Sequence, residues 1–562
     1  MSLHGTNLQK NTAASRSGLA EYLLSLAILL TGIAQLAILP PFEGLDEVGH
    51  YSSIRQIAET GTMPMLGQSF ISPDAIDYRA HGPSPYDLPI SAVPGKTPTN
   101  SDIITYQKFF ASPDLQKDFV ARYRDGRAPV AYARITDEFN WEAQHPPLYY
   151  LIMAPLMKAT DGLPLVSQFF VLRLASFLLA YAGLLIAARA TVKYLKNDIA
   201  PRLGAGLFLL YPLLVPMFFP EFGRIGNDAL CLFLFGLIWS LVLAWRCDDD
   251  GDMNEVALGI CFGLGLLTKA FFIPLLGGFC LLATVWIARE RKSRKVAPHL
   301  QKFGLAVGIA LLIGAWWYII QYARNGAMSG SLDAVMLAQH GGLVAGLREH
   351  FTLTQFITDI GWTIRSWSWF GTESFVTVPL LWQAPVLVLS VALFVFYAGA
   401  ILRKSYAAPR WMPFWFIGPF LAALVWHILV CEASNFNFTP GWYLSISAPL
   451  FATMMAYGWG AGGKVRILFG LLLVYAIGYL TMVFWAQASL FAGCAVKGPD
   501  KLYQFPDEAF CTDRYTQIMG NLSVLGWPNM ALFAFGGGIL CLVLALIIMR
   551  NFSGPIINER QS

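Results

Sequence analysis

The chain carries Pro40-Pro41-Phe42-Glu43-Gly44-Leu45-Asp46-Glu47-Val48-Gly49-His50-Tyr51 directly after an apolar run, Tyr22–Leu39, that is long enough to cross a bilayer. Two adjacent carboxylates, Asp46 and Glu47, are therefore expected where a membrane helix meets water. His50 follows the aspartate by four residues. This combination behind a double proline makes the stretch the first candidate functional element of the chain.

The composition is that of an integral membrane protein. Of 562 residues, 56% are hydrophobic and 13% are charged, whereas soluble domains carry roughly 25% charged residues. The apolar runs are about 20 residues long, so helices rather than short alternating strands are the expected spanning elements. The net charge of +4 does not indicate nucleic-acid binding, because the basic residues gather in short loops, as membrane orientation signals do. We therefore expect an all-α polytopic membrane protein.

About twelve transmembrane helices are predicted, with both termini in the cytoplasm. The segment 146–158 is apolar but short and contains Pro155. If it does not cross the membrane, Lys and Arg gather in the loops on one side; if it does cross, the positive-inside rule fails repeatedly. We therefore assign 146–158 to an interfacial or re-entrant helix. The predicted spans are 20–39, 166–191, 203–220, 228–246, 255–268, 271–289, 303–323, 381–402, 411–431, 442–460, 466–488 and 529–549.

This topology places nearly all irregular sequence outside the cytoplasm. A short amphipathic helix over Val48–Glu59, with Ile54, Ile57 and Ala58 on one face, is predicted in the long first outer loop. The inner loops contain no P-loop and no Gly-rich strand-to-helix turn. The predicted layout is a cytoplasmic tail at 1–18, a first transmembrane helix at 19–40, a periplasmic loop with interfacial helices at 41–165, transmembrane helices 2–7 at 166–324, a periplasmic loop at 325–380, transmembrane helices 8–11 at 381–488, a periplasmic loop at 489–528, and a last transmembrane helix with a cytoplasmic tail at 529–562.

Asp46 and Glu47 have two interpretations. A carboxylate at this place could act as a general base that takes the proton of an acceptor hydroxyl. Alternatively, the pair could cap the short helix that begins near Val48, where negative charge is favourable. Glu47 could also help to bind a cation or orient Asp46. His50 and Tyr51 could contact a substrate or be passive polar residues.

Cations near the outer surface are candidates for binding a phosphate. Lys269 stands between two apolar runs, where it could hold a phosphate at the headgroup level or snorkel from a helix end. Arg224 is a second candidate, with Asp228 or Glu221 as its expected partner. Asp228 could instead cap the helix that follows. Arg173 lies inside an apolar run and must find a partner, so packing is its expected role.

Aromatic residues and cysteines of the outer loops are the remaining candidates. Trp367, Trp442 and Tyr443 offer planes for a sugar or a polyprenyl chain, although aromatic residues are common at membrane interfaces for other reasons. Of the eight cysteines, Cys494 and Cys511 bracket a polar outer loop, where a disulfide can form. The sequence has no Cys/His metal spacing.

Together these stretches resemble the GT-C superfamily of membrane glycosyltransferases that use polyprenyl-phosphate sugars. That superfamily includes protein O-mannosyltransferases and the lipid A aminoarabinose transferase. The likeness rests on Asp46-Glu47 after the first helix and on His145-Pro146-Pro147-Leu148-Tyr149-Tyr150. It is supported by Arg173–Ser176, Leu267-Thr268-Lys269 and Gly441-Trp442-Tyr443, in the expected order over roughly the first 450 residues.

The resemblance implies a GT-C-like fold with Asp46 as the catalytic base of an inverting sugar transfer. It implies a polyprenyl-phosphate-linked sugar as donor and a lipid, glycan or protein as acceptor. The active site would face the periplasm at a bacterial inner membrane. His145 and Tyr149 are then expected in the substrate site. A divalent metal ion assists some relatives, but no clear second metal-binding carboxylate motif is present here.

Two other functions are compatible with parts of the pattern. A polymerase or ligase of lipid-linked glycans would use similar chemistry in the same superfamily. A transporter or flippase of lipid-linked sugars would be expected to show inverted repeats and broken helices near the bilayer midplane. The chain shows no convincing internal repeat, and its Gly and Pro interruptions are spread rather than paired.

Overall fold

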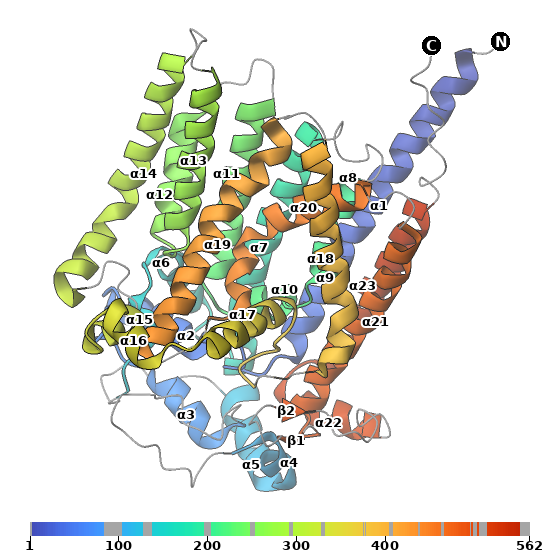
Figure 1. The fold of residues 1–562 in the computed structure, drawn as a ribbon. Helices are drawn as coiled ribbons and strands as arrows, with labels where there is room; N and C mark the ends of the chain where they lie inside the picture. Colours follow the sequence, from blue (N-terminus) through green and yellow to red (C-terminus); the bar gives the residue numbers. More distant parts are fainter. Residues whose placement is uncertain are drawn as a thin grey trace.

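Helices dominate the computed structural model, which confirms the predicted all-α polytopic fold (Figure 1). The structure describes residues 3–83, 104–126, 138–195, 204–247, 253–290, 296–326, 332–374, 376, 378–403, 408–435, 439–461, 466–494, 496–497, 503–504 and 514–550. Within these residues, nine helices are long and apolar enough to cross a membrane. They are α1 (Leu3–Ile38), α7 (Leu165–Leu195), α11 (Asp228–Cys247), α13 (Phe272–Glu290), α14 (Val296–Asn325), α18 (Leu380–Arg403), α19 (Ala408–Ser434), α21 (Arg466–Phe491) and α23 (Pro528–Arg550).

Shorter elements connect these helices, and many of them gather at one end of the bundle. They are α2 (Glu47–Thr60), α3 (Pro73–His81), α4 (Tyr106–Ala111), α5 (Pro113–Phe119), a π-helical turn (Val120–Arg124), a 3₁₀ turn (Trp141–Gln144), α6 (Leu148–Ala159), α8 (Gly204–Leu209), α9 (Tyr211–Leu214), α10 (Phe218–Phe222), α12 (Glu255–Leu266), α15 (Leu332–Gln339), α16 (Leu343–His350), α17 (Leu353–Ser368), a 3₁₀ helix (Gly441–Ser447), α20 (Ala448–Ala461) and α22 (Tyr515–Leu525). Strands β1 (Val496–Lys497) and β2 (Tyr503–Gln504) form a small antiparallel pair.

The structure corrects the predicted span 203–220. This segment is broken into the three short helices α8, α9 and α10, because Pro212 and Pro216 cannot donate the backbone hydrogen bonds of a continuous helix. The predicted span 255–268 corresponds to the 12-residue helix α12, and 442–460 begins as a 3₁₀ helix before α20. The predicted number of twelve long spans is therefore higher than the nine found among the described residues.

The two helices predicted outside the spans both form. α6 has 12 residues with Pro155 inside it, so it is about 18 Å long and too short to cross a bilayer core of about 30 Å. α2 covers the predicted Val48–Glu59, but its surroundings differ from the prediction. Every residue from 47 to 56 is buried, whereas Glu59 and Thr60 are exposed, so protein encloses all of α2 except its last turn.

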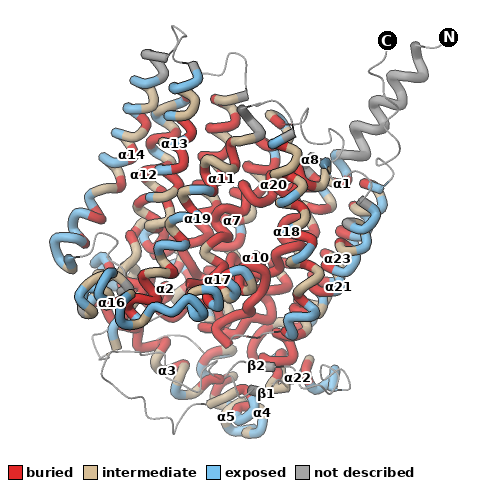
Figure 2. Tube along the Cα trace, viewed as in Figure 1, coloured by how far each residue is buried: buried red, intermediate tan, exposed pale blue. Residues whose placement is uncertain are grey.

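Close helix contacts build the bundle around α7 and α11. The first and last described helices, α1 and α23, pack along each other, and α7 packs along α11. At the second contact the backbones nearly touch: a Cβ on Gly236 would lie 2.3 Å from the carbonyl oxygen of Gly183. Every residue from 206 to 232 is buried, and Figure 2 shows this buried region at the centre of the bundle. The first turn of α11 therefore lies in a region enclosed by protein, beside α2 and α6.

Candidate active site

The turn that carries Asp46 has an unusual backbone. Phe42 and Asp46 adopt φ values of 64° and 55°, a left-handed conformation that non-glycine residues rarely occupy and that is often found at functional sites. Asp46 stands at the N-cap position of α2, but its side chain makes no capping hydrogen bond. Instead, Glu47 accepts a hydrogen bond from the backbone N–H of Gly44, with an N to Oε2 distance of 3.1 Å. The capping alternative therefore does not hold for Asp46.

Glu47 anchors this turn to α7. Its carboxylate is fully buried and accepts hydrogen bonds from Arg173 on both oxygens, at 2.8 Å from Nε and 2.5 Å from Nη2. The backbone N–H of Ile225 also donates to Oε1 at 2.9 Å, and the Arg173 guanidinium donates to the carbonyls of Leu39 and Pro40. The catalytic role predicted for Glu47 does not fit this geometry, because both oxygens are bound. Glu47 is instead the partner that the buried Arg173 requires.

Asp46 has a less saturated carboxylate. The residue is partly exposed, and its carboxylate accepts a hydrogen bond from the indole Nε1 of Trp141 at 3.2 Å. Its backbone N–H donates to Glu373 Oε2 at 3.2 Å. Burial of the carboxyl group and the negative charge of Glu142 raise the pKa of Asp46 to about 6, against the lowering effect of Arg224. A carboxyl with this pKa is suited to general base catalysis near neutral pH.

Glu142 lies between two imidazoles. Its Oε2 is 3.3 Å from His50 Nε2 and 3.0 Å from His145 Nε2. Burial alone would raise the pKa of Glu142, but the neighbouring imidazole of His145, the largest opposing influence, lowers it to about 2. Burial lowers the pKa of His50 to about 3, and its Nδ1 forms a hydrogen bond of 2.9 Å with the hydroxyl of Tyr150. Glu142 is therefore ionised at neutral pH and keeps a negative charge beside Asp46.

A chain of ion pairs holds the two predicted cations. Lys269 Nζ lies 2.9 and 2.8 Å from the two carboxylate oxygens of Asp228, and Arg224 Nη2 lies 2.8 Å from Asp228 Oδ2. Arg224 also donates to Glu221 at 2.8 Å and to the carbonyl of Leu45 at 2.6 Å. Both expected partners of Arg224 are thus confirmed. Lys269 is only 5% exposed, so the alternative of a snorkelling lysine is wrong.

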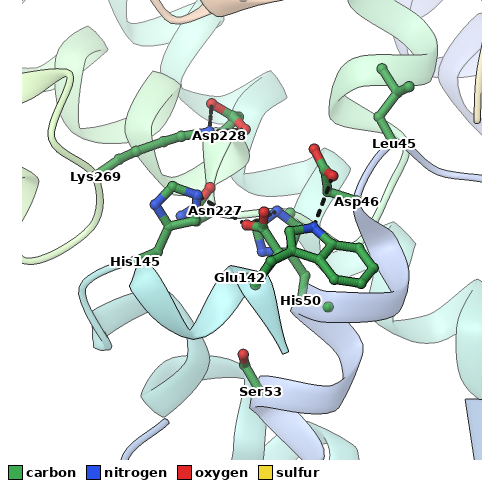
Figure 3. Close-up of polar contacts among 12 residues, drawn as sticks. Leu45, Asp46, His50, Ser53, Glu142, His145, Asn227, Asp228 and Lys269 are labelled. Atoms are coloured by element: carbon green, nitrogen blue, oxygen red, sulfur yellow. Dashed lines mark hydrogen bonds and ion pairs between the residues drawn. The ribbon is translucent and has the colours of Figure 1, made fainter. Parts of the chain in front are cut away.

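Figure 3 shows how these groups converge from distant parts of the chain. Asp46, His50, Glu142, Asp228 and Lys269 point toward one another, whereas Ser53 lies apart from them. The active-site cluster, as we call it below, comprises Asp46, His50, Glu142, His145, Arg224, Asp228 and Lys269. It combines a carboxyl with a raised pKa and two cations in one enclosed region, which is an arrangement suited to proton transfer next to a developing negative charge.

Two predicted substrate residues instead hold the scaffold. Tyr51 is fully buried, and its hydroxyl donates to Asp74 at 2.5 Å and to Gln168 at 3.2 Å. The hydroxyl of Tyr149 pairs with Ser176 at 2.7 Å and accepts a hydrogen bond of 3.1 Å from the backbone N–H of Gly226. Because these hydroxyls are bound within the protein, both tyrosines fit a supporting role better than direct substrate contact.

The three predicted aromatic residues have different surroundings. Tyr443 lies beside the cluster, since the Lys269 ammonium stands 5.5 Å from the centre of its ring. Trp442 packs on Phe370, and Trp367 packs on Phe394 and Phe451, in the protein interior. The structure therefore brings Tyr443 to the cluster and places the two tryptophans in packing positions.

Only one of the two cysteines of the predicted disulfide lies among the described residues. Cys494 is disulfide-bonded, in agreement with the prediction. Cys511 lies outside the described residues, so the pairing itself stays a prediction.

Four residues near the Asp46 turn were not predicted from the sequence. Trp141 and Glu142 precede His145 closely, and an acidic residue three positions before the His-Pro-Pro motif is the signal that could have pointed to them. Glu43 is fully buried and accepts hydrogen bonds from Tyr106, Thr372 and Ser374. Glu43 stands three residues before Asp46, but nothing in the local sequence indicates its hydrogen-bond partners. Nothing in the local sequence around Glu373 indicates its contact with Asp46 either.

A family model of predicted membrane proteins, DUF2142, matches residues 29–408. The chain belongs to the DUF2142 family. The matched region contains the whole active-site cluster and ends at the first residue of α19. The family description and the apolar helices agree that this DUF2142 protein crosses the membrane several times.

The structure was also compared with solved structures of other proteins. Two solved structures of ArnT from Cupriavidus metallidurans match the DUF2142 chain. The structure bound to undecaprenyl phosphate has 12% sequence identity and a TM-score of 0.45, over 94% of this chain and 77% of the other. The apo structure has 15% identity and a TM-score of 0.39, over 79% and 70%. No curated protein matches the sequence significantly.

Proposed function

We propose that this protein is a GT-C-type glycosyltransferase that moves one sugar from a polyprenyl phosphate to an acceptor hydroxyl, with Asp46 as general base. One observation carries the proposal. Asp46 is a partly exposed residue whose carboxyl group makes no capping hydrogen bond and has a pKa raised to about 6, within the electrostatic reach of the cations Arg224 and Lys269. The motif order described for the sequence supports the same superfamily.

In this reaction the carboxylate and the cations of the active-site cluster have separate roles. Asp46 accepts the proton of the acceptor hydroxyl as its oxygen attacks the anomeric carbon. The bond between the anomeric carbon and the phosphate oxygen breaks, and the polyprenyl phosphate leaves with the electron pair. With a single base and a phosphate leaving group, the configuration is inverted. Lys269 and Arg224, both within 2.9 Å of Asp228, are placed to stabilise the negative charge of the departing phosphate.

The expected side of the membrane follows from charge. Each short connection predicted to be cytoplasmic carries Lys or Arg, whereas the short outer connections carry little beyond Arg224 and Lys269, and Asp46 follows α1 at the outer end. We therefore propose that the site faces the periplasm of a bacterial inner membrane, where a lipid-linked donor replaces nucleotide sugars. The acceptor would be a lipid, a glycan or a protein.

The positions of the charged groups favour an enzyme over a transporter. Asp46 follows α1, Glu142 precedes α6, Asp228 begins α11, and Lys269 lies between α12 and α13. Transporter sites for substrates and coupling ions typically lie near the bilayer midplane, on interrupted helices. Here the cluster gathers at helix ends, which suits chemistry at one membrane surface.

The test compares donor consumption by wild type and Asp46→Asn. Both proteins are purified in detergent and incubated with a panel of radiolabelled polyprenyl-phosphate sugars, with membrane lipid extract as the source of acceptors. Wild type should consume one donor, and Asp46→Asn should be at least about 100-fold slower, since a positioned general base contributes roughly 10²–10⁴-fold. Asp114→Asn, an exposed aspartate of α5, is the matched control and should retain full activity.

Other outcomes assign other functions. Equal rates for wild type and Asp46→Asn would show that Asp46 is not the base. A ladder of products of increasing length would indicate a polymerase. Movement of a lipid-linked sugar across reconstituted vesicles, without consumption of any donor, would support a flippase instead.

A further inference from the structure

A second group of metal-ligating side chains lies away from the active-site cluster, on the hairpin of α15 and α16. One potential metal ligand atom comes from each of His340, Glu349 and His350, and these three atoms lie within 4.8 Å of one another. Among the described residues, no other group of three or more His, Cys, Asp or Glu side chains meets this distance. His340 directly follows α15, and His350 is the last residue of α16. The two imidazole rings meet edge to face, with centroids 5.4 Å apart.

An unsatisfied buried nitrogen indicates that this arrangement is suited to an ion. The Nε2 atom of His350 is buried and has no hydrogen-bond partner among the described residues; the oxygen Oε2 of Glu349 stands 3.8 Å away, too far for a hydrogen bond. A buried polar nitrogen without a partner is unfavourable. A cation between these groups would satisfy this nitrogen and share the Glu349 carboxylate.

The donor set selects the class of metal. Two imidazoles and one carboxylate suit Zn²⁺, whereas Mg²⁺ and Ca²⁺ prefer sites made of oxygen atoms. Zinc bonds of roughly 2.1 Å in a tetrahedron put neighbouring ligand atoms about 3.4 Å apart. Ligand atoms up to 4.8 Å apart must therefore approach by at most about 1.4 Å, which side-chain rotations achieve. A water molecule would complete four-coordination.

We propose that His340, Glu349 and His350 form a zinc site that fastens the α15–α16 hairpin. The hairpin rests on α19 with very little space between backbones, because a Cβ on Gly346 would lie 2.2 Å from the carbonyl oxygen of Ala433. α19 ends at Ser434. Zinc at this place would hold the hairpin in the conformation that permits this close contact.

Metal content is the decisive measurement. Full-length protein in detergent is treated with a chelator, incubated with zinc chloride, freed of unbound metal by gel filtration, and analysed by mass spectrometry for zinc. Wild type should retain about one equivalent of zinc more than His340→Ala and more than His350→Ala. His81→Ala, which removes a partly exposed histidine near Asp77, is the matched control and should retain as much zinc as wild type.

A second readout covers variants that fold poorly. Zinc should raise the thermal unfolding midpoint of wild type and of His81→Ala, but not that of His340→Ala, whose side chain is not buried in the hairpin. The absence of tightly held zinc in wild type would overturn the proposal. So would loss of the zinc in His145→Ala with retention in His340→Ala, because the metal would then belong to the active-site cluster.

Discussion

At the scale of single residues, the environment of Asp46 determines its chemistry. Asp46 and Glu47 are neighbours in sequence, yet the Asp46 carboxylate accepts one hydrogen bond, from Trp141, whereas the Glu47 carboxylate is enclosed by Arg173 and two backbone N–H groups. A buried carboxylate with this many donors is a structural ion pair. Asp46 instead lies near the negative charge of Glu142, which favours its protonated form.

The pH profile of the enzyme should report this interaction. As a base, Asp46 must be deprotonated, so kcat/KM of wild type should rise with pH through about 6. Glu142→Gln removes a negative charge that raises the pKa of Asp46, so the acidic limb should move to lower pH by about one unit. Trp141→Phe removes a hydrogen bond that lowers this pKa, so its limb should move to higher pH. An unchanged limb in both variants would contradict Asp46 as the titrating base.

At the scale of secondary-structure elements, close contacts between helices explain where the active-site cluster lies. α7 supplies Arg173 and α11 begins with Asp228, so the crossing of these two helices sets the distance between the Asp46 turn and the cations. The crossing is tight because Gly183 and Gly236 face each other without side chains. The predicted span 203–220 is broken by prolines, so α8, α9 and α10 do not cross as one helix, and α10 packs against α11.

A side chain at this crossing should push α7 and α11 apart. A Cβ on Gly236 would lie 2.3 Å from the Gly183 carbonyl oxygen, so Gly236→Ala should destabilise the protein by about 1–3 kcal/mol, as overpacking does. Gly308→Ala is the matched control, because Gly308 lies in helix α14 with nothing within 4 Å of an added Cβ. Thermal unfolding in detergent measures both. Equal unfolding midpoints for the two variants would show that the crossing tolerates a side chain.

At the scale of the whole molecule, the Asp46 turn is fastened to segments from very different parts of the chain. Glu43 accepts hydrogen bonds from Tyr106 Oη at 2.5 Å, Thr372 Oγ1 at 3.0 Å and Ser374 Oγ at 2.8 Å. The backbone N–H of Glu373 also donates to the Glu43 carbonyl at 3.0 Å. The segment after α1 and the segment after α17 therefore meet on one buried carboxylate, three residues before the proposed base.

Loss of this connection should affect rate and stability together. In Glu43→Gln an amide N–H₂ group would face hydroxyl donors, and buried hydrogen bonds to a charged group are worth roughly 1.5–3 kcal/mol. We expect a lower unfolding midpoint, and a fall in kcat that exceeds any change in KM, because the Asp46 turn shifts while the cations stay. Glu138→Gln, which disrupts a more accessible ion pair with Arg79, is the control and should cost at most about 1 kcal/mol. Equal effects of the two substitutions would contradict the role of Glu43.

The sequence by itself determined the helical, multi-pass class of this protein, because hydrophobic length and the absence of charge set where helices can cross a bilayer. It also pointed to Asp46, to Lys269 and to the pairing of Arg224 with Glu221 and Asp228, since these partners are three and four residues away on adjoining turns. Only the tertiary structure decided that Glu47 is an anchor, that Trp141 and Glu373 reach Asp46, and that Glu142 sets its charge environment. Glu373 is 327 residues and Trp141 is 95 residues from Asp46. Contacts over such separations depend on how all the intervening helices pack, and no local pattern in the sequence carries that information.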